Sequence, residues 1–251
     1  MPRRLTSSAL RLIPILLLLG CLSGCGTCPQ RLADAAGRAA IHPATWLPAA
    51  GALALQIDDW DDNLATWATR HNPVFGTESN ADTAGDVLTV GLAASGVGSG
   101  YLLSRREQNP AYDELLADGS ALGGSALATL GLKGMINRTR PDGSDRDSFP
   151  SGHSAVAVSG AILTCQHLQR MNLTQTTRTV AQGGAILGAS LAGWARVEAG
   201  EHYASDVLAG AALGNFLTRV AHDTLLPEQA NTQISINPTT TGWVVGLSVD
   251  Y

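Results

Sequence analysis

The hydrophobic pattern of the chain predicts helices over most of its length. Several segments are rich in Ala, Leu and Gly, and turn-like pairs such as Asn72-Pro73 and Asn109-Pro110 separate some of them. These segments lie near residues 45–70, 83–104, 113–137, 153–170, 178–196 and 203–225. We therefore expect an all-α fold that consists of a single bundle of about six helices.

The pattern changes near the C-terminus. Apolar and polar residues alternate around Ile234 and again around Leu247, with a turn-like stretch between them. Such alternation is typical of strands. We expect residues 42–226 to form the helical domain and residues 227–251 to form a short β-hairpin tail, to which we assign no chemistry.

Composition supports helices that pack closely in one core. Aromatic residues make up only 5% of the 251 residues, and Gly occurs 28 times, which disfavours a sheet built from large side chains. The uncharged windows at residues 87–103 and 180–195 hold 17 and 16 residues, fewer than the roughly 20 that a membrane-spanning helix needs. Mean hydropathy is only +0.08. We therefore expect buried helices of a soluble domain.

The N-terminus has the layout of a secretory signal. Arg3, Arg4 and Arg11 precede an apolar run, and the run ends in Leu22-Ser23-Gly24-Cys25. This segment resembles a bacterial lipoprotein signal, in which the Cys becomes the acylated first residue of the mature chain. The alternative is an ordinary signal that happens to contain Cys.

The lipoprotein interpretation sets the expected location and the first boundaries. Residues 1–24 would be the signal peptide, Cys25 the lipidation site, and residues 25–41 a tether of small and polar residues. The protein would then lie in the bacterial cell envelope, anchored by lipid and facing the periplasm, with the outer membrane favoured. The membrane is thus one expected partner.

Net charge and cysteine content limit the possible partners, disulfides and metal sites of the chain. Loss of residues 1–24 removes three Arg and no acid, so the formal charge moves from −5 to −8, which argues against a nucleic-acid partner. Cys28 and Cys165 would remain as thiols, and a bridge between them is an open alternative because sequence does not show proximity. No zinc-ligand spacing is present, and we expect no metal and no cofactor.

The first stretch with candidate chemistry runs from Lys133 to Pro141. Lys133 and Arg140 are seven residues apart, so on a helix they project from nearly the same face. Pro141 disfavours helix at Arg140 and frees that side chain to turn toward whatever Lys133 faces. Two cations on one face suggest an anion between them, whereas the alternative is a solvated basic helix end.

The second stretch, Ser148 to Ser154, directly precedes an apolar helical run. Ser151 is a good N-cap, and Gly152 permits close approach of a ligand to the unpaired N–H groups of a helix N-terminus. Such a terminus suits an anion, and His153 would stand beside it. The alternative is a capped helix start with an incidental histidine.

The third stretch runs from Arg196 to Asp206. His202 and Asp206 are four residues apart, so on a helix the carboxylate can accept a hydrogen bond from one imidazole nitrogen and leave the other as a free lone pair. That arrangement suits a nucleophilic histidine. The alternatives are a surface pair and a pair of metal ligands, but Lys133, Arg140 and Arg196 would repel a metal cation.

Together the three stretches resemble the signature of the type 2 phosphatidic acid phosphatase and vanadium haloperoxidase superfamily. The matching elements are Lys133, six residues, Arg140-Pro141; then Pro150-Ser151-Gly152-His153; then Arg196, five residues, His202, three residues, Asp206. The resemblance covers roughly residues 80–222. One position departs, because the family commonly has Ser where this chain has Ala195.

The resemblance implies a role for each matching residue. It implies that the phosphoryl oxygens bind to Lys133, Arg140, Arg196, Ser151 and the backbone N–H of Gly152. His202 would be the nucleophile, Asp206 its partner and His153 the general acid. Three cations and helix N–H groups could stabilise the charge of a phosphoryl-transfer transition state without a metal.

The resulting hypothesis is a metal-independent, acid-type phosphatase that acts through a phospho-histidine on a phosphomonoester or a lipid phosphate or pyrophosphate. The acidic residues 142–147 border the site and could discriminate between soluble and lipid substrates. A vanadate-dependent haloperoxidase and a non-catalytic envelope lipoprotein are the alternatives. Four further histidines match no stretch, and we expect ordinary surface or half-buried positions for His42, His71, His167 and His222.

Overall fold

The computed structural model describes residues 28–107, 111–226, 231–239 and 242–250. Eight helices lie within this part of the chain, and the all-α fold class is confirmed for the domain. They are α2 Cys28–Ile41, α3 Pro43–Ala54, α4 Trp60–His71, α5 Glu78–Glu107, α6 Ala111–Ile136, α7 Gly152–Arg170, α8 Gln175–Glu198 and α9 Ala204–Leu225. The signal at residues 1–24 and the lipidation site Cys25 lie outside the described residues.

The expected count of six helices is too low for two reasons. The segment predicted at 45–70 is broken into α3 and α4, because Asp58 takes a left-handed backbone conformation (φ 50°) that a continuing helix does not allow. Residues 28–41, expected to form part of a tether, instead form α2. Ala35 and Ala39 lie one helical turn apart on its buried face, which packs on α9.

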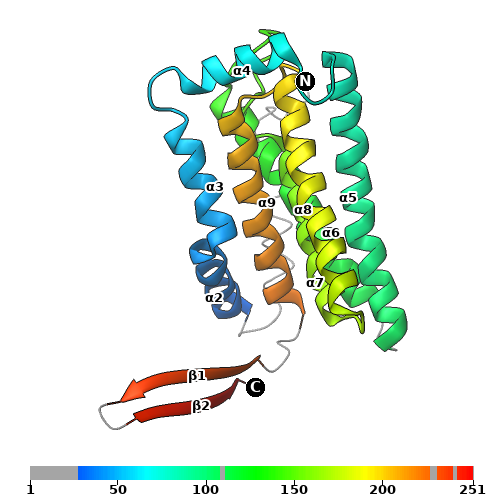
Figure 1. The fold of residues 1–251 in the computed structure, drawn as a ribbon, viewed down its shortest axis with the longest axis vertical. Helices are drawn as coiled ribbons and strands as arrows, with labels where there is room; N and C mark the ends of the chain where they lie inside the picture. The colour runs from blue at the N-terminus through cyan, green and yellow to red at the C-terminus, as the bar shows by residue number, and fades with distance from the viewer. Residues whose placement is uncertain (1–27, 108–110, 227–230, 240–241, 251) are drawn as a thin grey trace, which may run out of the picture.

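The long helices run along one another, and α4 lies across one end of the bundle (Figure 1). Helix α7 packs against α5, α6, α8 and α9. A Cβ atom at Gly160 of α7 would collide with the backbone of Leu92 in α5, so glycine permits this close approach. The apolar core here consists of Leu92, Ala157, Ala161, Ala185, Ala189 and Ala192. Small side chains thus let the helices pack closely, as the composition suggested.

The expectation that the apolar helices are buried is wrong for α5 and α6. Both are long and apolar enough to cross a membrane, yet only 33% of each apolar window is buried inside the protein. Val90 of α5 and Leu130 of α6 are exposed over 68% and 65% of their surface. Their aliphatic side chains therefore form an outer apolar surface.

The C-terminal strands and Cys165 also relate to expectations from the sequence. Strands β1 Asn231–Thr239 and β2 Gly242–Asp250 pair antiparallel, with Asn231 opposite Asp250. Cys165 of α7 has a free thiol, and the side chain of Cys28, the other half of the possible bridge, lies outside the part of the chain that the structure describes.

Candidate active site

The three sequence stretches meet at the end of the bundle where α4 lies. Helices α6 and α8 end there, and α7 and α9 begin there, because successive long helices run in opposite directions (Figure 1). Lys133 is in the last turn of α6 and Arg196 in the last turn of α8. Ser151 caps the start of α7 by accepting a hydrogen bond from the Ser154 amide, as predicted.

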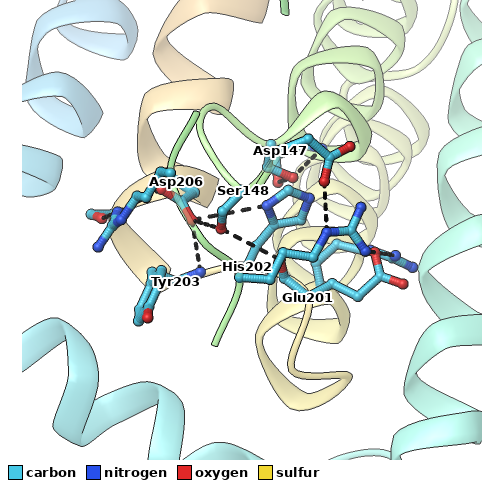
Figure 2. A network of polar contacts seen from close by, with 12 residues as sticks. Asp147, Ser148, Glu201, His202, Tyr203 and Asp206 are labelled. Carbon is cyan, nitrogen blue, oxygen red and sulfur yellow. Dashed lines mark hydrogen bonds and ion pairs between the residues drawn. The ribbon is translucent and has the colours of Figure 1, made fainter. Parts of the chain in front are cut away.

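The structure brings the three predicted cations together through shared carboxylates. Asp147 lies 3.5 Å from Lys133 Nζ and accepts a hydrogen bond of 2.8 Å from Arg140 Nε. Glu201 pairs with Arg140 Nη1 at 3.0 Å and also with Arg196. Figure 2 shows Asp147 and Glu201 beside the His202 ring. Each bridging carboxylate offsets the repulsion between neighbouring cations.

Helix α5 supplies acids that hold Arg196 and His153. Arg196 is only 2% exposed and donates to Asp82 Oδ1 at 2.7 Å. His153 Nε2 lies 2.9 Å from Asp86 Oδ1, and Asp86 is also 3.7 Å from Arg196. A Cβ atom at Gly85 would stand 2.9 Å from Arg196 Cδ, so glycine lets the arginine lie along α5.

Ala195 also packs against this part of α5. It is fully buried, and a Cβ atom at Gly85 would lie 3.5 Å from its methyl group. The departure from the family pattern therefore places a small apolar group at a tight helix contact.

His202 occupies the buried centre of the site and is 1% exposed. Burial lowers its pKa well below the ordinary value, and the charges of Lys133 and Arg196 lower the pKa further. The imidazole is therefore neutral at neutral pH. A neutral ring retains the lone pair that a nucleophile needs.

The expected hydrogen bond between His202 and Asp206 is not formed. His202 precedes α9, which begins at Ala204, so the spacing of four residues does not act as a helical turn. His202 Nδ1 lies 3.9 Å from Asp206 Oδ2 (Figure 2). Asp206 instead accepts hydrogen bonds from Ser148 Oγ at 2.5 Å and from the Tyr203 amide at 2.9 Å.

Sequence reasoning missed Arg138 and Asp61. Arg138 donates to Asp206 Oδ1 at 2.6 Å and to Asp61 Oδ2 at 2.9 Å, and its guanidinium carbon lies 4.0 Å from the Tyr203 ring centroid. Asp61 of α4 also accepts from the Ser205 amide at 3.0 Å. Arg138 could have been identified from sequence, because it lies inside the basic stretch from Lys133 to Pro141. No local pattern indicates a role for Asp61.

The pKa of His153 is lowered by burial and by the Arg196 charge, while Asp86 acts in the opposite direction. For Asp206, burial raises the pKa, opposed by the Ser148 hydrogen bond and the Arg138 charge. The protonation of His153 thus depends on two opposing effects: Asp86 raises the pKa of the imidazole, and Arg196 lowers it.

The remaining histidines divide into two groups. His42 caps α3 by accepting a hydrogen bond from the Ala44 amide at 3.1 Å, and His71 is exposed. The expectation is wrong for the other two, because His167 and His222 are buried, with 0% and 8% exposure. His167 of α7 and His222 of α9 both face α6, where each lies near Asp118.

Comparison with known proteins gives a family match, a relative by sequence and a solved structure with a similar fold. Residues 114–227 match the PAP2 superfamily. The lipid A 1-phosphatase of Porphyromonas gingivalis is 35% identical over 103 residues, which cover 38% of this chain but only 22% of that protein. A transmembrane PAP2-type phosphatidylglycerolphosphate phosphatase from Bacillus subtilis, known from its crystal structure, has a similar fold with a TM-score of 0.56.

The structural match is 23% identical in sequence and covers 70% of this chain and 90% of the Bacillus subtilis chain. The matched residues 114–227 hold the three basic and histidine-containing stretches described above. The comparisons thus support the PAP2 superfamily for the region that carries the site, on a fold similar to that of a PAP2-type phosphatase.

Proposed function

We propose that the chain is a lipid phosphatase in which His202 forms a covalent phospho-histidine. The observation that carries this proposal is a buried histidine of lowered pKa among three cations from two separate stretches, Lys133 and Arg140 in the first and Arg196 in the third. Such cations suit the oxygens of a phosphoryl group. The match of this region to the PAP2 superfamily supports the same reaction class.

In the proposed first step, His202 Nε2 attacks phosphorus. Nδ1 lies on the side of Asp206 and Ser148, and the other nitrogen points away from them (Figure 2). The new bond joins Nε2 to phosphorus as the bond from phosphorus to the alkoxide oxygen breaks. The three cations stabilise the charge on the equatorial oxygens, and the start of α7 at Ser151 and Gly152 adds N–H donors and a favourable dipole.

His153 carries the proton in both steps. The protonated imidazole gives a proton to the leaving alkoxide, which departs as an alcohol. Water then attacks phosphorus while the neutral His153 accepts a proton from it, and the bond between phosphorus and His202 breaks. General acid and base assistance of this kind contributes roughly 10² to 10⁴ in rate. Asp206 acts as a positioning residue through the loop that holds His202, rather than as a direct hydrogen-bond partner.

We propose a lipid phosphate rather than a soluble one as the substrate. The two relatives are phosphatases whose names specify lipid A and phosphatidylglycerolphosphate. An open apolar pocket of about 270 Å³ adjoins the loop before α7 and is lined by Leu132, Phe149, Pro150, Leu213 and Phe216 among others. Together with the apolar outer surface of α5 and α6, this open pocket favours a substrate that carries hydrocarbon.

The proposed location follows from the N-terminal sequence. Acylation at Cys25 would attach the chain to a bacterial membrane on its periplasmic side, with the outer membrane favoured. The exposed side chains of α5 and α6 would then lie against lipid. A membrane-attached site would meet lipid phosphates at high local concentration.

The reaction is tested by phosphate release from a panel of lipid phosphates and soluble phosphomonoesters, with EDTA present and at a temperature where the chelated protein is folded. We expect His202→Asn to lower kcat by about 10³-fold or more. Labelled substrate quenched in alkali should leave phosphate on the wild-type chain and not on the variant.

His71→Asn is the matched control, because His71 is exposed and lies outside the site. It should retain wild-type phosphate release. Release by His202→Asn above a tenth of the wild-type rate would contradict the proposed nucleophile. Equal kcat/KM for lipid and soluble substrates would contradict the proposed substrate class.

A further inference from the structure

A second cluster of ionisable side chains lies inside the bundle, away from the candidate active site. Asp118 of α6, His167 of α7 and His222 of α9 each offer a ligand atom, and these atoms lie within 4.8 Å of one another. Asp118 and His167 are fully buried, and His222 is 8% exposed. His167 is fourteen residues beyond His153 on α7, which places the cluster about 21 Å along the helix from the site.

The cluster leaves two buried polar atoms without hydrogen-bond partners. These are Asp118 Oδ2 and His167 Nε2. Both face Gly100 of α5, where an added Cβ atom would collide with Asp118 Oδ2 and stand 3.3 Å from His167 Nε2. Glycine at this position therefore keeps the space beside these atoms open. An unpartnered carboxylate oxygen at 0% exposure is costly unless a cation or donor meets it.

The Ser99 contact is compatible with a lone pair on Nε2 of His167. Ser99 Oγ lies 2.9 Å from both the Gly96 carbonyl oxygen and His167 Nδ1. When the hydroxyl donates its one proton to the carbonyl, the imidazole donates its Nδ1–H to Ser99 Oγ. The lone pair is then on Nε2, which faces Asp118 Oδ1 at 3.4 Å.

A lone pair that faces a carboxylate oxygen is repelled unless a positive charge lies between them. The distances suit a metal ion, since His222 Nε2 and His167 Nε2 lie 3.0 and 3.4 Å from Asp118 Oδ1. Ligands about 2.1 Å from a tetrahedral zinc ion are separated by about 3.4 Å. Ser99 would orient His167 from outside, as is usual for a metal-binding histidine.

We propose that Asp118, His167 and His222 bind a divalent transition-metal ion, with Zn²⁺ as the best match to two imidazoles and one carboxylate. The ion joins α6, α7 and α9 at the end of the bundle opposite the candidate active site. Its role is to stabilise the fold, and it takes no part in phosphate release. The proposal does not depend on the proposed function.

The test uses the full chain with a purification tag that lacks histidine. The protein is stripped with a chelator, desalted and titrated with ZnCl₂, and bound zinc is measured by elemental analysis. We expect about one zinc per chain, and a rise in Tm of at least about 5 °C at 100-fold excess over Kd. Asp118→Asn and His222→Gln should each abolish binding and the rise in Tm.

Two controls separate this site from other histidines. His71→Gln and His202→Asn should both still bind zinc, because they remove an exposed histidine and an active-site histidine. Loss of zinc in His202→Asn together with retention in His222→Gln would overturn the proposal. So would the absence of zinc from the wild-type chain, which would identify a proton on His167 as the occupant.

Cobalt keeps the test decisive if a variant fails to fold. Co²⁺ bound to the wild-type chain by this ligand set should give the intense visible absorption bands of a four-coordinate ion, and zinc should displace it. Absence of those bands would overturn the proposal. Phosphate release by the chelated chain below its Tm should match that of the zinc-loaded chain.

Discussion

Arg138 and Arg140 lie two residues apart but contact different surroundings, and replacing each with methionine should separate a structural role from a substrate-binding role. Arg138 donates to Asp206 at 2.6 Å, to Asp61 at 2.9 Å and to Ser205 Oγ at 2.7 Å. The side chains of Asp206 and Asp61 are only 0% and 5% exposed. Arg138→Met would leave two buried carboxylates without their cation.

Removal of one partner from a buried ion pair typically destabilises a protein by about 3 to 5 kcal/mol. Arg138 itself is 24% exposed, so water can reach part of the vacated space, and the lower end of that range applies. A loss of about 3 kcal/mol corresponds to a fall in Tm of about 6 to 12 °C for a domain of this size.

Arg140→Met is the matched comparison. Its partners Asp147 and Glu201 are 40% and 23% exposed, and such pairs contribute at most about 1 kcal/mol. Its removal also relieves repulsion with Lys133, so Tm should change by less than about 3 °C. Because we propose that Arg140 binds the phosphoryl group, KM should rise strongly in this variant.

Both variants are measured by thermal unfolding and by steady-state phosphate release at a temperature where both are folded. Arg138→Met should lower Tm and keep a KM near that of the wild-type chain. Equal Tm values for the two variants would refute the assignment of Arg138 to the scaffold. An unchanged KM in Arg140→Met would refute its contact with substrate.

Two further predictions concern the general acid and the anchor. Asp86 raises the pKa of His153, so Asp86→Asn should lower that pKa and move the alkaline limb of the pH profile of kcat to lower pH. The control Asp82→Asn should shift this limb less, because Asp82 pairs with Arg196. An unmoved limb in Asp86→Asn would exclude His153 as the proton donor. Cys25→Ser should abolish the incorporation of labelled palmitate in cells, whereas the control Cys28→Ser should still incorporate the label. Incorporation of label into the Cys25→Ser protein would rule out the proposed anchor.

The sequence predicted those parts of the site that depend on local signals. Helix periodicity places Lys133 and Arg196 in last turns, and Ser151 is recognisable as an N-cap from its neighbours alone. The same local reasoning failed for His202, because the spacing to Asp206 has meaning only inside a helix and α9 begins two residues after His202.

Long-range pairs could not be predicted, since nothing near Asp82 in the sequence indicates that it meets Arg196. These residues are 114 positions apart, and Arg138 and Asp61 are 77 apart. The buried cluster at Asp118 was missed for the same reason, because its three members come from three helices. One local feature was also overlooked, namely the helix break at Asp58 between α3 and α4.

The acids around the three cations bear on how a phosphate would enter. Asp147 and Glu201 bridge these cations at the place where we propose that phosphoryl oxygens bind, so substrate must displace carboxylates rather than water alone. Burial would raise the pKa of Asp147, but the Arg140 hydrogen bond and the Lys133 charge hold it below the ordinary value, so this competitor stays charged in mild acid.

A phosphate dianion is repelled by such carboxylates more strongly than a monoanion, and the second pKa of a phosphomonoester is about 6. Lowering the pH through that value therefore weakens the repulsion before Asp147 is neutralised. The lowered pKa of His153 acts in the same direction, because a larger fraction of the general acid becomes protonated. His202 stays neutral over this interval, so nucleophile, acid and substrate charge all favour turnover on the acidic side of neutrality.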